Sequence, residues 1–395
     1  MIATTTSDSK PEEEIKRIAI DGGPCSGKTT GMAKIVQALQ GVGIIPVTVP
    51  EAATMLMAGG IAPWTMDIID FQEHASRLQV NLETTFMTGA RELGRKHGRP
   101  AVLITDRGLV GQAAYLPGTD RLKMLNDLLL GSIGMSVEAA RARYAGVIHL
   151  VTAADGAEDS YTLTNNAQRK ESPEEARAVD RRTQEAWLGH SHLAIVPNRD
   201  RDGRRISFEE KMRRTVAEVF RILGFPQPIE DEERYWVEPF DLDHSLIRHE
   251  KVRIWQAYLA APSTGAEERI RERRWLGSST YYHTVKTPTG DGRDFEPERM
   301  ITLGEFNRLR SRIDRDSTPI EKDRYYFIWH DQYFEADMYL GRHAGLYKLE
   351  REKTDRNEST VMPPFIKVIR DVTHDTSFRN RALAARSWSI DSLSA

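Results

Sequence analysis

The chain has 395 residues, of which 39% are hydrophobic and 29% are charged, a balance typical of a globular protein with more than one core. The formal net charge of −3 argues against a protein that coats nucleic acid, so no nucleic-acid partner is expected. The single cysteine, Cys25, excludes an intramolecular disulfide, and no apolar run approaches the roughly 18 residues that span a bilayer. We therefore expect a cytoplasmic protein.

The first half alternates between buried strands and helices, after a polar N-terminal tail. Helical periodicity runs over residues 28–40, 66–96 and 207–224, and Ser207 and Gly224 have the residue types that begin and end a helix. Such alternation predicts a parallel sheet with helices on both faces. The predicted strands are residues 17–21, 44–50, 101–105, 146–151 and 192–196.

The pattern changes in the second half. From about residue 253, charged and apolar residues alternate in short runs separated by turns such as "GDGRD" and "GRHAG", which predicts antiparallel strands. The expected fold is thus an α/β domain followed by an antiparallel α+β domain. The expected boundaries are a tail at 1–14, a first domain at 15–228, a second at 229–386 and a tail at 387–395.

The segment "GGPCSGKTT" satisfies the pattern G-x-x-x-x-G-K-[ST] between a predicted strand and a predicted helix. Its glycines allow backbone N–H groups to turn toward phosphate oxygens, and the positive end of the following helix adds to this attraction. Lys28 is expected to reach the β- and γ-phosphates, and the Thr29 hydroxyl to ligate Mg²⁺. The predicted nucleotide-binding residues are Gly22, Gly23, Pro24, Cys25, Ser26, Gly27, Lys28, Thr29 and Thr30.

Two carboxylates follow predicted strands at the edge where an open α/β sheet binds its ligand. Asp106 suits a role in organising Mg²⁺, and Glu51 suits a base for a substrate hydroxyl. The alternatives are a helix-capping Asp106 and a surface Glu51.

Residues 165–192 form a polar, arginine-rich helical segment. Arg169, Arg177 and Arg181 are expected to close over phosphates as a lid, unless they lie on a solvated helix face. Asn198 follows the last predicted strand, where a base-recognition loop is expected. The residues leave the choice between GTP and ATP open.

The runs "GGPCSGKTT", "PEAAT", "DRG", "NNAQRKE" and "AWLGHSHLAIVPN" are similar to the NadR-like AAA-type P-loop domain, and more specifically to the TRPL translocation defect family. The resemblance covers about residues 16–386. It implies a guanine- or adenine-nucleotide-binding domain fused to a CYTH-like domain that binds phosphoinositides. It also implies that the second domain is a closed antiparallel barrel of the triphosphate-tunnel type.

Such a barrel needs cations for polyphosphate and a few carboxylates for metal, at alternate strand positions that face the lumen. Charged residues of this kind recur over successive predicted strands, and four of these strands carry them at i, i+2 spacing. Any one pair alone is better explained as an exposed ion-pair ladder. The candidate phosphate-binding residues are Arg269, Arg271, Arg273, Lys286, Arg299, Lys322, Arg324, Glu335, Asp337, Glu350 and Glu352.

The sequence departs from the CYTH resemblance at the first strand, where CYTH phosphatases carry the metal-binding pattern E-x-E-x-K. By register with the following "YL", these positions are Arg253, Trp255 and Ala257, so the acidic pair is absent. This predicts a domain that binds phosphates rather than one that hydrolyses them.

Three functions follow from these features. The first is a regulatory protein that binds GTP or ATP with Mg²⁺ and a phosphoinositide headgroup or polyphosphate, with peripheral membrane contact. The second is a small-molecule kinase in which Glu51 is the base, and Lys28 with Arg169 or Arg181 stabilises the transferred phosphoryl group. The third is a tunnel triphosphatase.

Overall fold

The computed structural model describes most of the chain. Side chains at 287–299 and at Glu352 are outside this description. The described residues are 15–161, 172–200, 202–224, 232–260, 267–289, 293–295, 298–352 and 359–390.

The first half contains a five-stranded parallel sheet with the order β2-β3-β1-β4-β5. All residues of β1 and β4 are buried, because helices cover both faces of the sheet. The predicted five-stranded α/β arrangement is confirmed. The strands are β1 Arg17–Gly22, β2 Ile45–Val49, β3 Ala101–Asp106, β4 Gly146–Leu150 and β5 Leu193–Val196.

Helices α1 (Lys28–Gly41) and α7 (Phe208–Leu223) pack together, and their apolar residues share one core with β1, β3 and β4. Helix α7 begins and ends as predicted, because Ser207 caps its first turn and Gly224 adopts φ 75° at its end. The remaining helices of this half are α2 Ala52–Ala58, α3 Ile68–His97, η1 Leu109–Tyr115, α4 Arg121–Ile133, α5 Val137–Ala142, η2 Glu158–Ser160 and α6 Pro173–Ala186.

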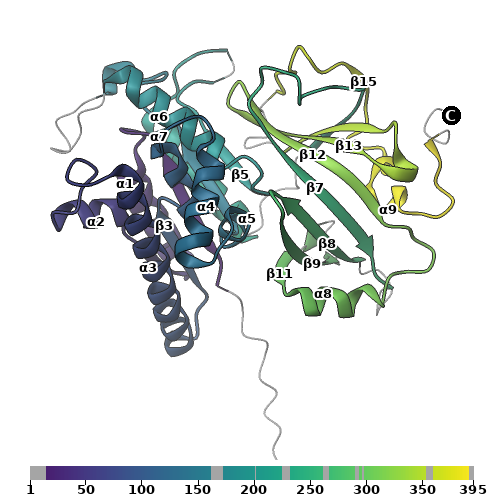
Figure 1. The fold of residues 1–395 in the computed structure, drawn as a ribbon, viewed down its shortest axis with the longest axis horizontal. Helices are drawn as coiled ribbons and strands as arrows, with labels where there is room; N and C mark the ends of the chain where they lie inside the picture. Colours follow the sequence, from purple (N-terminus) through teal and green to yellow (C-terminus); the bar gives the residue numbers. More distant parts are fainter. Residues whose placement is uncertain are drawn as a thin grey trace, which may run out of the picture.

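The second half is a ten-stranded antiparallel sheet on the opposite side of the molecule from α1, α2 and α3 (Figure 1). Its order is β10-β9-β8-β7-β12-β13-β14-β6-β15, with β11 paired to β9. Among the described residues no strand pair joins the two ends of this order, so a closed barrel is not shown. The strands are β6 Glu232–Val237, β7 His249–Tyr258, β8 Glu267–Trp275, β9 Ser278–Thr289, β10 Arg293–Phe295, β11 Glu298–Ile301, β12 Ile320–Trp329, β13 Gln332–Tyr339, β14 Tyr347–Glu352 and β15 Val368–Asp371.

The first strand of this sheet is β6, which corrects the register expected from the sequence. The expected first strand contained Arg253, but that residue belongs to β7, the second strand. Strand β6 pairs with β14 and places Glu232 and Arg234 opposite Glu352 and Glu350. One glutamate, Glu232, therefore occupies this face of the first strand, with Arg234 at the next alternate position of the described residues.

Short helices and the C-terminal segment cover the second sheet. Helix α8 (Leu303–Arg310) packs on β8 and β9. Helix η3 (Gly341–His343) contacts β12, and η4 (Thr376–Phe378) contacts α9 (Asn380–Leu383). Trp388 is only 9% exposed and belongs to a core with Phe378. The expected C-terminal tail at 387–395 is therefore wrong at its start, because residue 388 is packed into the fold.

The two halves share an apolar core. Trp187 and Leu188 follow α6 and pack in one cluster with Val252, Ile254 and Tyr326 of the antiparallel sheet. Polar contacts surround this cluster. Arg273 Nε donates to Glu138 Oε1 at 2.9 Å, and the Tyr333 hydroxyl accepts from Gly189 N–H at 3.1 Å and donates to His190 O at 2.9 Å.

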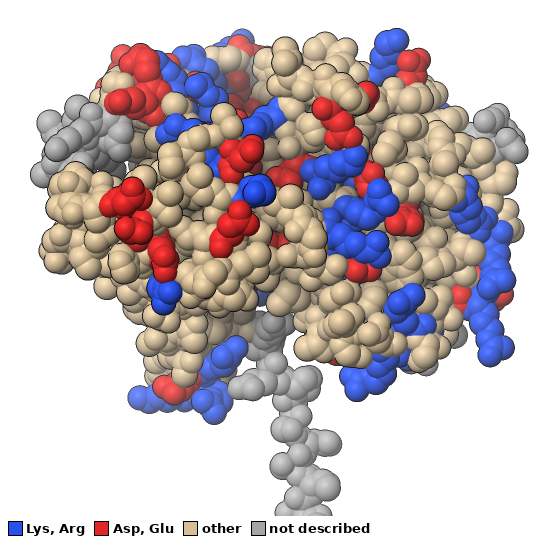
Figure 2. Space-filling view, viewed as in Figure 1, with Lys and Arg blue, Asp and Glu red and all other residues tan. Residues whose placement is uncertain are grey.

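Charged side chains of both signs are intermixed on the face shown in Figure 2. On the outer side of β7, Lys251 pairs with Asp243 at 2.7 Å and Arg253 with Glu321 at 3.3 Å. None of the described helices combines the length and apolar character needed to cross a membrane.

Candidate nucleotide and phosphate sites

The loop between β1 and α1 has the backbone of a phosphate-binding turn. Three of its residues have positive φ: Gly22 at 145°, Cys25 at 55° and Gly27 at 93°. Gly27 is the N-cap of α1 and provides no side-chain cap, so the first N–H groups of the helix have no side-chain acceptor at that residue. This arrangement suits an anion at the positive end of the helix.

The ammonium group of Lys28 lies inside the loop. Its Nζ donates to Gly22 O at 3.0 Å and to Gly23 O at 3.2 Å. Burial, and secondarily the guanidinium of Arg107, lower the pKa of Lys28 to about 8, although nearby carboxylates act in the opposite direction. Lys28 is thus held at the position where its charge would meet a phosphate.

Asp106 ends β3 and lines the same cavity as Thr29. Burial raises the pKa of Asp106, and its Oδ1 is buried without a hydrogen-bond partner among the described groups. A buried, unpaired carboxylate oxygen beside a hydroxyl fits Mg²⁺, which takes few protein ligands and keeps several waters. In the described part of the chain, no three His, Cys, Asp or Glu residues are grouped to hold a metal by themselves.

Arg107 is a site residue that the sequence reasoning missed. It has φ 67° and forms an ion pair with Glu51, while its Nη1 lies 3.4 Å from Asp21 Oδ1 and donates to Gly22 O at 3.1 Å. The sequence feature that could have identified Arg107 is its place directly after Asp106 in "DRG". This place follows the carboxyl end of a predicted strand, the edge where the site was expected. The left-handed backbone turns this side chain back toward the phosphate loop.

Glu51 lies at the same edge, immediately before α2. Its Oε2 accepts from Thr54 Oγ1 at 2.7 Å, and its Oε1 pairs with Arg107. Burial favours protonation, but the charges of Arg107 and Lys28 outweigh it and lower the pKa of Glu51. The carboxyl group is therefore ionised at neutral pH.

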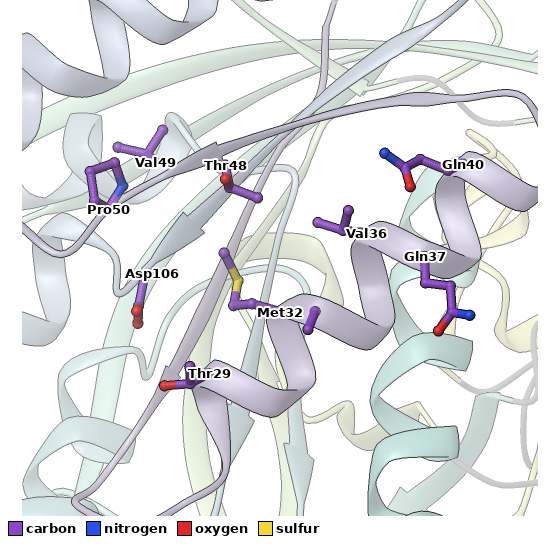
Figure 3. A pocket seen from close by; sticks show the side chains of 10 residues that line it. Thr29, Met32, Val36, Gln37, Gln40, Thr48, Val49, Pro50 and Asp106 are labelled. Carbon is purple, nitrogen blue, oxygen red and sulfur yellow. The ribbon is translucent and has the colours of Figure 1, made fainter. Parts of the chain in front are cut away.

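A cavity of about 550 Å³ extends from this edge along α1 (Figure 3). Thr29 and Asp106 lie at one end, and the amides of Gln37 and Gln40 lie at the other. Met32, Ala33, Val36, Thr48, Val49 and Pro50 form the wall between them. The volume is in the range of small-molecule sites.

The arginines predicted to form a lid have separate positions. Arg177 Nη1 donates to Ala154 O at 2.7 Å, and its Nη2 pairs with Glu174 at 2.8 Å. Arg169 is outside the described residues, and Arg181 is exposed on α6. The neighbouring Asp180 anchors α6 beside the phosphate loop, where its Oδ1 accepts from Gly23 N–H at 2.7 Å. The described helix is therefore docked against the loop, with Arg181 facing solvent.

Asn198 is buried after β5. Its Nδ2 donates to Thr152 O at 2.7 Å and Asp155 O at 2.6 Å, and its Oδ1 accepts from Lys211 Nζ at 2.8 Å. A contact from this amide to a nucleotide base would have to break these bonds.

The antiparallel sheet gathers charged residues on one face, because directly paired residues in neighbouring strands share a face. On this inner face Glu267 and Lys286 are a neighbouring pair of one acid and one cation. Among the other charged residues named here, the cationic ones outnumber the acidic ones. The cationic residues are Arg234, Arg269, Arg271, Arg273, Lys322, Arg324 and Lys348, and the acidic residues are Glu232, Glu335, Asp337 and Glu350.

Much of this charge is neutralised within the sheet. Arg324 donates to Asp337 at 2.6 Å and to Glu350 at 2.6 Å, and also pairs with Glu335. Lys322 pairs with Asp337. An entering anion would therefore compete with carboxylates for these two cations.

The other predicted inner-face residues differ in position. Arg273 is 3% exposed and bonds Glu138 and Gly189 O of the first half, so it belongs to the interface between the halves. Arg271 donates to Gln256 Oε1 at 3.5 Å, and Lys286 is half-buried. The side chains of Arg299 and Glu352 lie outside the described residues.

Together, β1, the loop Gly22–Thr30 and α1 define a P-loop nucleotide-binding domain. Residues 17–204 match a family model described as an AAA domain. The comparisons do not confirm the finer resemblance to the TRPL translocation defect family. A search of curated proteins gives no significant match.

Among solved structures, the chain is similar to the inorganic triphosphatase NE1496, at 27% identity over 40% of this chain and 95% of that chain, with a TM-score of 0.31. A second structure, described as the hypothetical protein NE1496, has 28% identity, covers 40% of this chain and 97% of that chain, and gives a TM-score of 0.30. The PH1819 protein from Pyrococcus horikoshii OT3 has 15% identity, covers 31% of this chain and 80% of that chain, and gives a TM-score of 0.24.

Proposed function

We propose that the protein binds a nucleoside triphosphate with Mg²⁺ at the P-loop and transfers its terminal phosphoryl group to a hydroxyl of a small molecule. The observation that carries this proposal is the meeting of Lys28, Glu51, Asp106 and Arg107 at one edge of the sheet. Two cations suit the charge of the transferred group, and two carboxylates suit Mg²⁺ and the acceptor proton.

Each side chain then has one role. Thr29 and Asp106 hold Mg²⁺, directly or through water, and the ion when bound draws charge from the phosphate oxygens. Lys28 and Arg107 contact the transferred phosphoryl group. Once Arg107 contacts phosphate, Glu51 is released to accept the proton from the acceptor hydroxyl as that oxygen bonds phosphorus and the nucleoside diphosphate leaves. The cavity beside Thr29 and Asp106 is the place for the acceptor.

Turnover of the purified full-length chain tests this proposal. ATP and GTP are supplied separately with Mg²⁺, with and without a set of small hydroxylated acceptors, and Lys28→Ala is the control. Turnover that needs an acceptor and is lost in Lys28→Ala supports phosphoryl transfer. Slow hydrolysis that no acceptor accelerates would instead favour a regulatory nucleotide-binding protein.

A second candidate function concerns the antiparallel sheet, and the excess of cationic residues on its inner face favours it. We propose that this face binds a polyphosphate or the phosphorylated headgroup of a phosphoinositide, so that the protein contacts membranes peripherally in a nucleotide-dependent way. Binding to vesicles with and without phosphoinositide, and to soluble tripolyphosphate, separates the two ligands. The variant Arg271→Gln should weaken whichever ligand binds; unchanged binding would contradict this assignment.

Hydrolysis by the second sheet is testable in the same protein. Glu232 supplies one acidic residue on this face of the first strand, which weakens the sequence-based reason for excluding hydrolysis. Release of phosphate from tripolyphosphate by the Lys28→Ala variant, dependent on added Mg²⁺ or Mn²⁺, would identify the sheet as a triphosphatase. No release would leave the sheet as a binding site.

A further inference from the structure

Three side chains outside the P-loop bind backbone groups of the loop. Asp180 of α6 accepts from Gly23 N–H at 2.7 Å, and Lys211 of α7 donates to Ser26 O at 3.1 Å. The Thr152 hydroxyl, which follows β4, donates to Pro24 O. Since buried backbone polar groups need partners, the bonds from Lys211 and Thr152 satisfy two carbonyl oxygens, which a phosphate anion cannot bind.

Asp180 is the acidic side chain among these three, and it lies against the backbone of Gly23. A Cβ added to Gly23 would lie 2.6 Å from Asp180 Oδ1, so the carboxylate rests directly against the loop backbone. The same oxygen accepts from Thr152 N–H at 3.0 Å, and Oδ2 accepts from Gln184 Nε2 at 3.1 Å. The carboxylate therefore joins α6 to both the phosphate loop and the segment after β4.

The surroundings hold this carboxylate in its charged form. Asp180 is 3% exposed, and His149 Nε2 lies 3.2 Å from Oδ1. Burial by itself favours the protonated acid, but His149 and the N–H groups of Gly23 and Thr152 reverse this effect and lower the pKa of Asp180. A charged acceptor forms stronger bonds to backbone N–H groups than a neutral one.

We propose that Asp180 is a positioning residue that holds the P-loop in its phosphate-binding conformation before the nucleotide arrives. The proposal deepens the proposed function and rests on nucleotide binding at this loop. A loop that is already ordered loses less conformational entropy when it binds phosphate. Its affinity for the nucleotide is therefore higher than that of a disordered loop.

The loop contains its own reporter, because Cys25 is the only cysteine in the chain. Cys25 is partly exposed in the folded loop, so its rate of modification by a thiol reagent, measured without nucleotide, changes when the loop leaves this conformation. Asp180→Ala removes the acceptor, whereas Asp180→Asn keeps an oxygen for Gly23 N–H. We expect Cys25 to react about tenfold faster in Asp180→Ala and within about threefold of wild type in Asp180→Asn.

Nucleotide affinity, measured with a fluorescent ATP or GTP analogue and Mg²⁺, should follow the same order. Asp180→Ala should bind about tenfold more weakly and Asp180→Asn nearly as well as wild type. Leu129→Ala, a core change of α4, serves as a control that lowers stability without touching the loop. Glu185→Gln removes a carboxylate from the same helix five residues further on.

The outcomes are distinct. Equal Cys25 reactivity in Asp180→Ala and in Leu129→Ala, at equal melting temperature, would overturn the proposal, because Asp180 would then act only through global stability. Equal behaviour of the Asn and Ala variants would also overturn it. If wild type and Lys28→Ala both fail to bind nucleotide, the proposed function fails, while the Cys25 rates still test the positioning of the loop.

Discussion

At the scale of single residues, Lys28 makes nucleotide binding depend on pH. Its pKa in the free protein is lowered to about 8, and only the charged ammonium attracts phosphate. The group is charged below that pH and loses its proton above it. We therefore expect the affinity for Mg²⁺-nucleotide to weaken as pH rises through about 8, by up to about tenfold per pH unit, in equilibrium titrations.

Two variants isolate the contribution of Lys28 to this pH dependence. Lys28→Arg replaces the group with one that stays charged, and should remove the decline in affinity above pH about 8. Cys25→Ser changes a different side chain of the same loop, leaves Lys28 in place, and should keep the decline. A decline that persists in Lys28→Arg would contradict its assignment to Lys28.

Glu51 gives a second test at this scale, because its expected role is in the proton transfer and not in holding the nucleotide. Glu51→Gln should lower acceptor-dependent turnover by about 100-fold, the usual contribution of a general base. Nucleotide affinity should remain within about threefold of wild type. Steady-state kinetics and direct binding separate these effects, and unchanged turnover would remove Glu51 from the mechanism.

At the scale of elements, the inner face of β12, β13 and β14 is held together by a buried charge cluster. Arg324 contacts three carboxylates, so Arg324→Met removes the cation that all three share. We expect a loss of about 3–5 kcal/mol in the free energy of unfolding by urea. Arg253→Met is the matched control on β7, where the arginine is 42% exposed, and should cost about 1 kcal/mol or less.

The pH dependence of stability tests the same cluster. Burial favours the neutral acid of Glu350, but Lys348, Arg324 and Lys322 dominate and hold its pKa well below the usual range. A carboxyl group with a lowered pKa stabilises the fold above its unfolded pKa, and this contribution is lost as pH falls. The difference in unfolding free energy between wild type and Arg324→Met should therefore shrink in acid. A difference that stays constant would contradict the assigned pairing.

Elements with a strong local pattern were predictable from the sequence. The five parallel strands are short, mainly apolar runs, and α7 has clear capping residues at both ends. Strand β6 was missed because its sequence, "EERYWV", begins with three charged residues, and pairing with β14 rather than local propensity makes it a strand.

The site was less predictable than the fold, because helical periodicity shows that a helix has a polar face but not which polar residue is buried. The arginines of α6 were expected to contact phosphate, yet Asp180 faces the loop and Arg181 faces solvent. Arg107 was missed because its direction depends on a left-handed turn and on the distant partners Glu51 and Asp21. Contacts between residues far apart in sequence determine both positions.

At the scale of the whole molecule, the two halves are joined by an apolar core and not only by a linker. The first half contributes Trp187 and Leu188, and the second contributes Val252, Ile254 and Tyr326. Arg273 and Glu138 form a buried ion pair at the edge of this core. The segment that carries these contacts follows α6, the helix whose Asp180 touches the P-loop.

This shared core predicts that the first half is unstable by itself. A fragment ending at Gly224 keeps the P-loop but loses the residues that cover Trp187 and Leu188, and leaves Glu138 without Arg273. Exposing this apolar surface should cost several kcal/mol, which corresponds to a melting temperature about 5–10 °C lower than that of the full chain. Calorimetry measures the melting temperatures of the fragment and of the full chain. Tyr333→Phe in the full chain is a milder change at the same interface, because it removes only a hydroxyl group. A fragment that melts at the same temperature as the full chain, together with two separate transitions in the full chain, would show that the halves are independent domains.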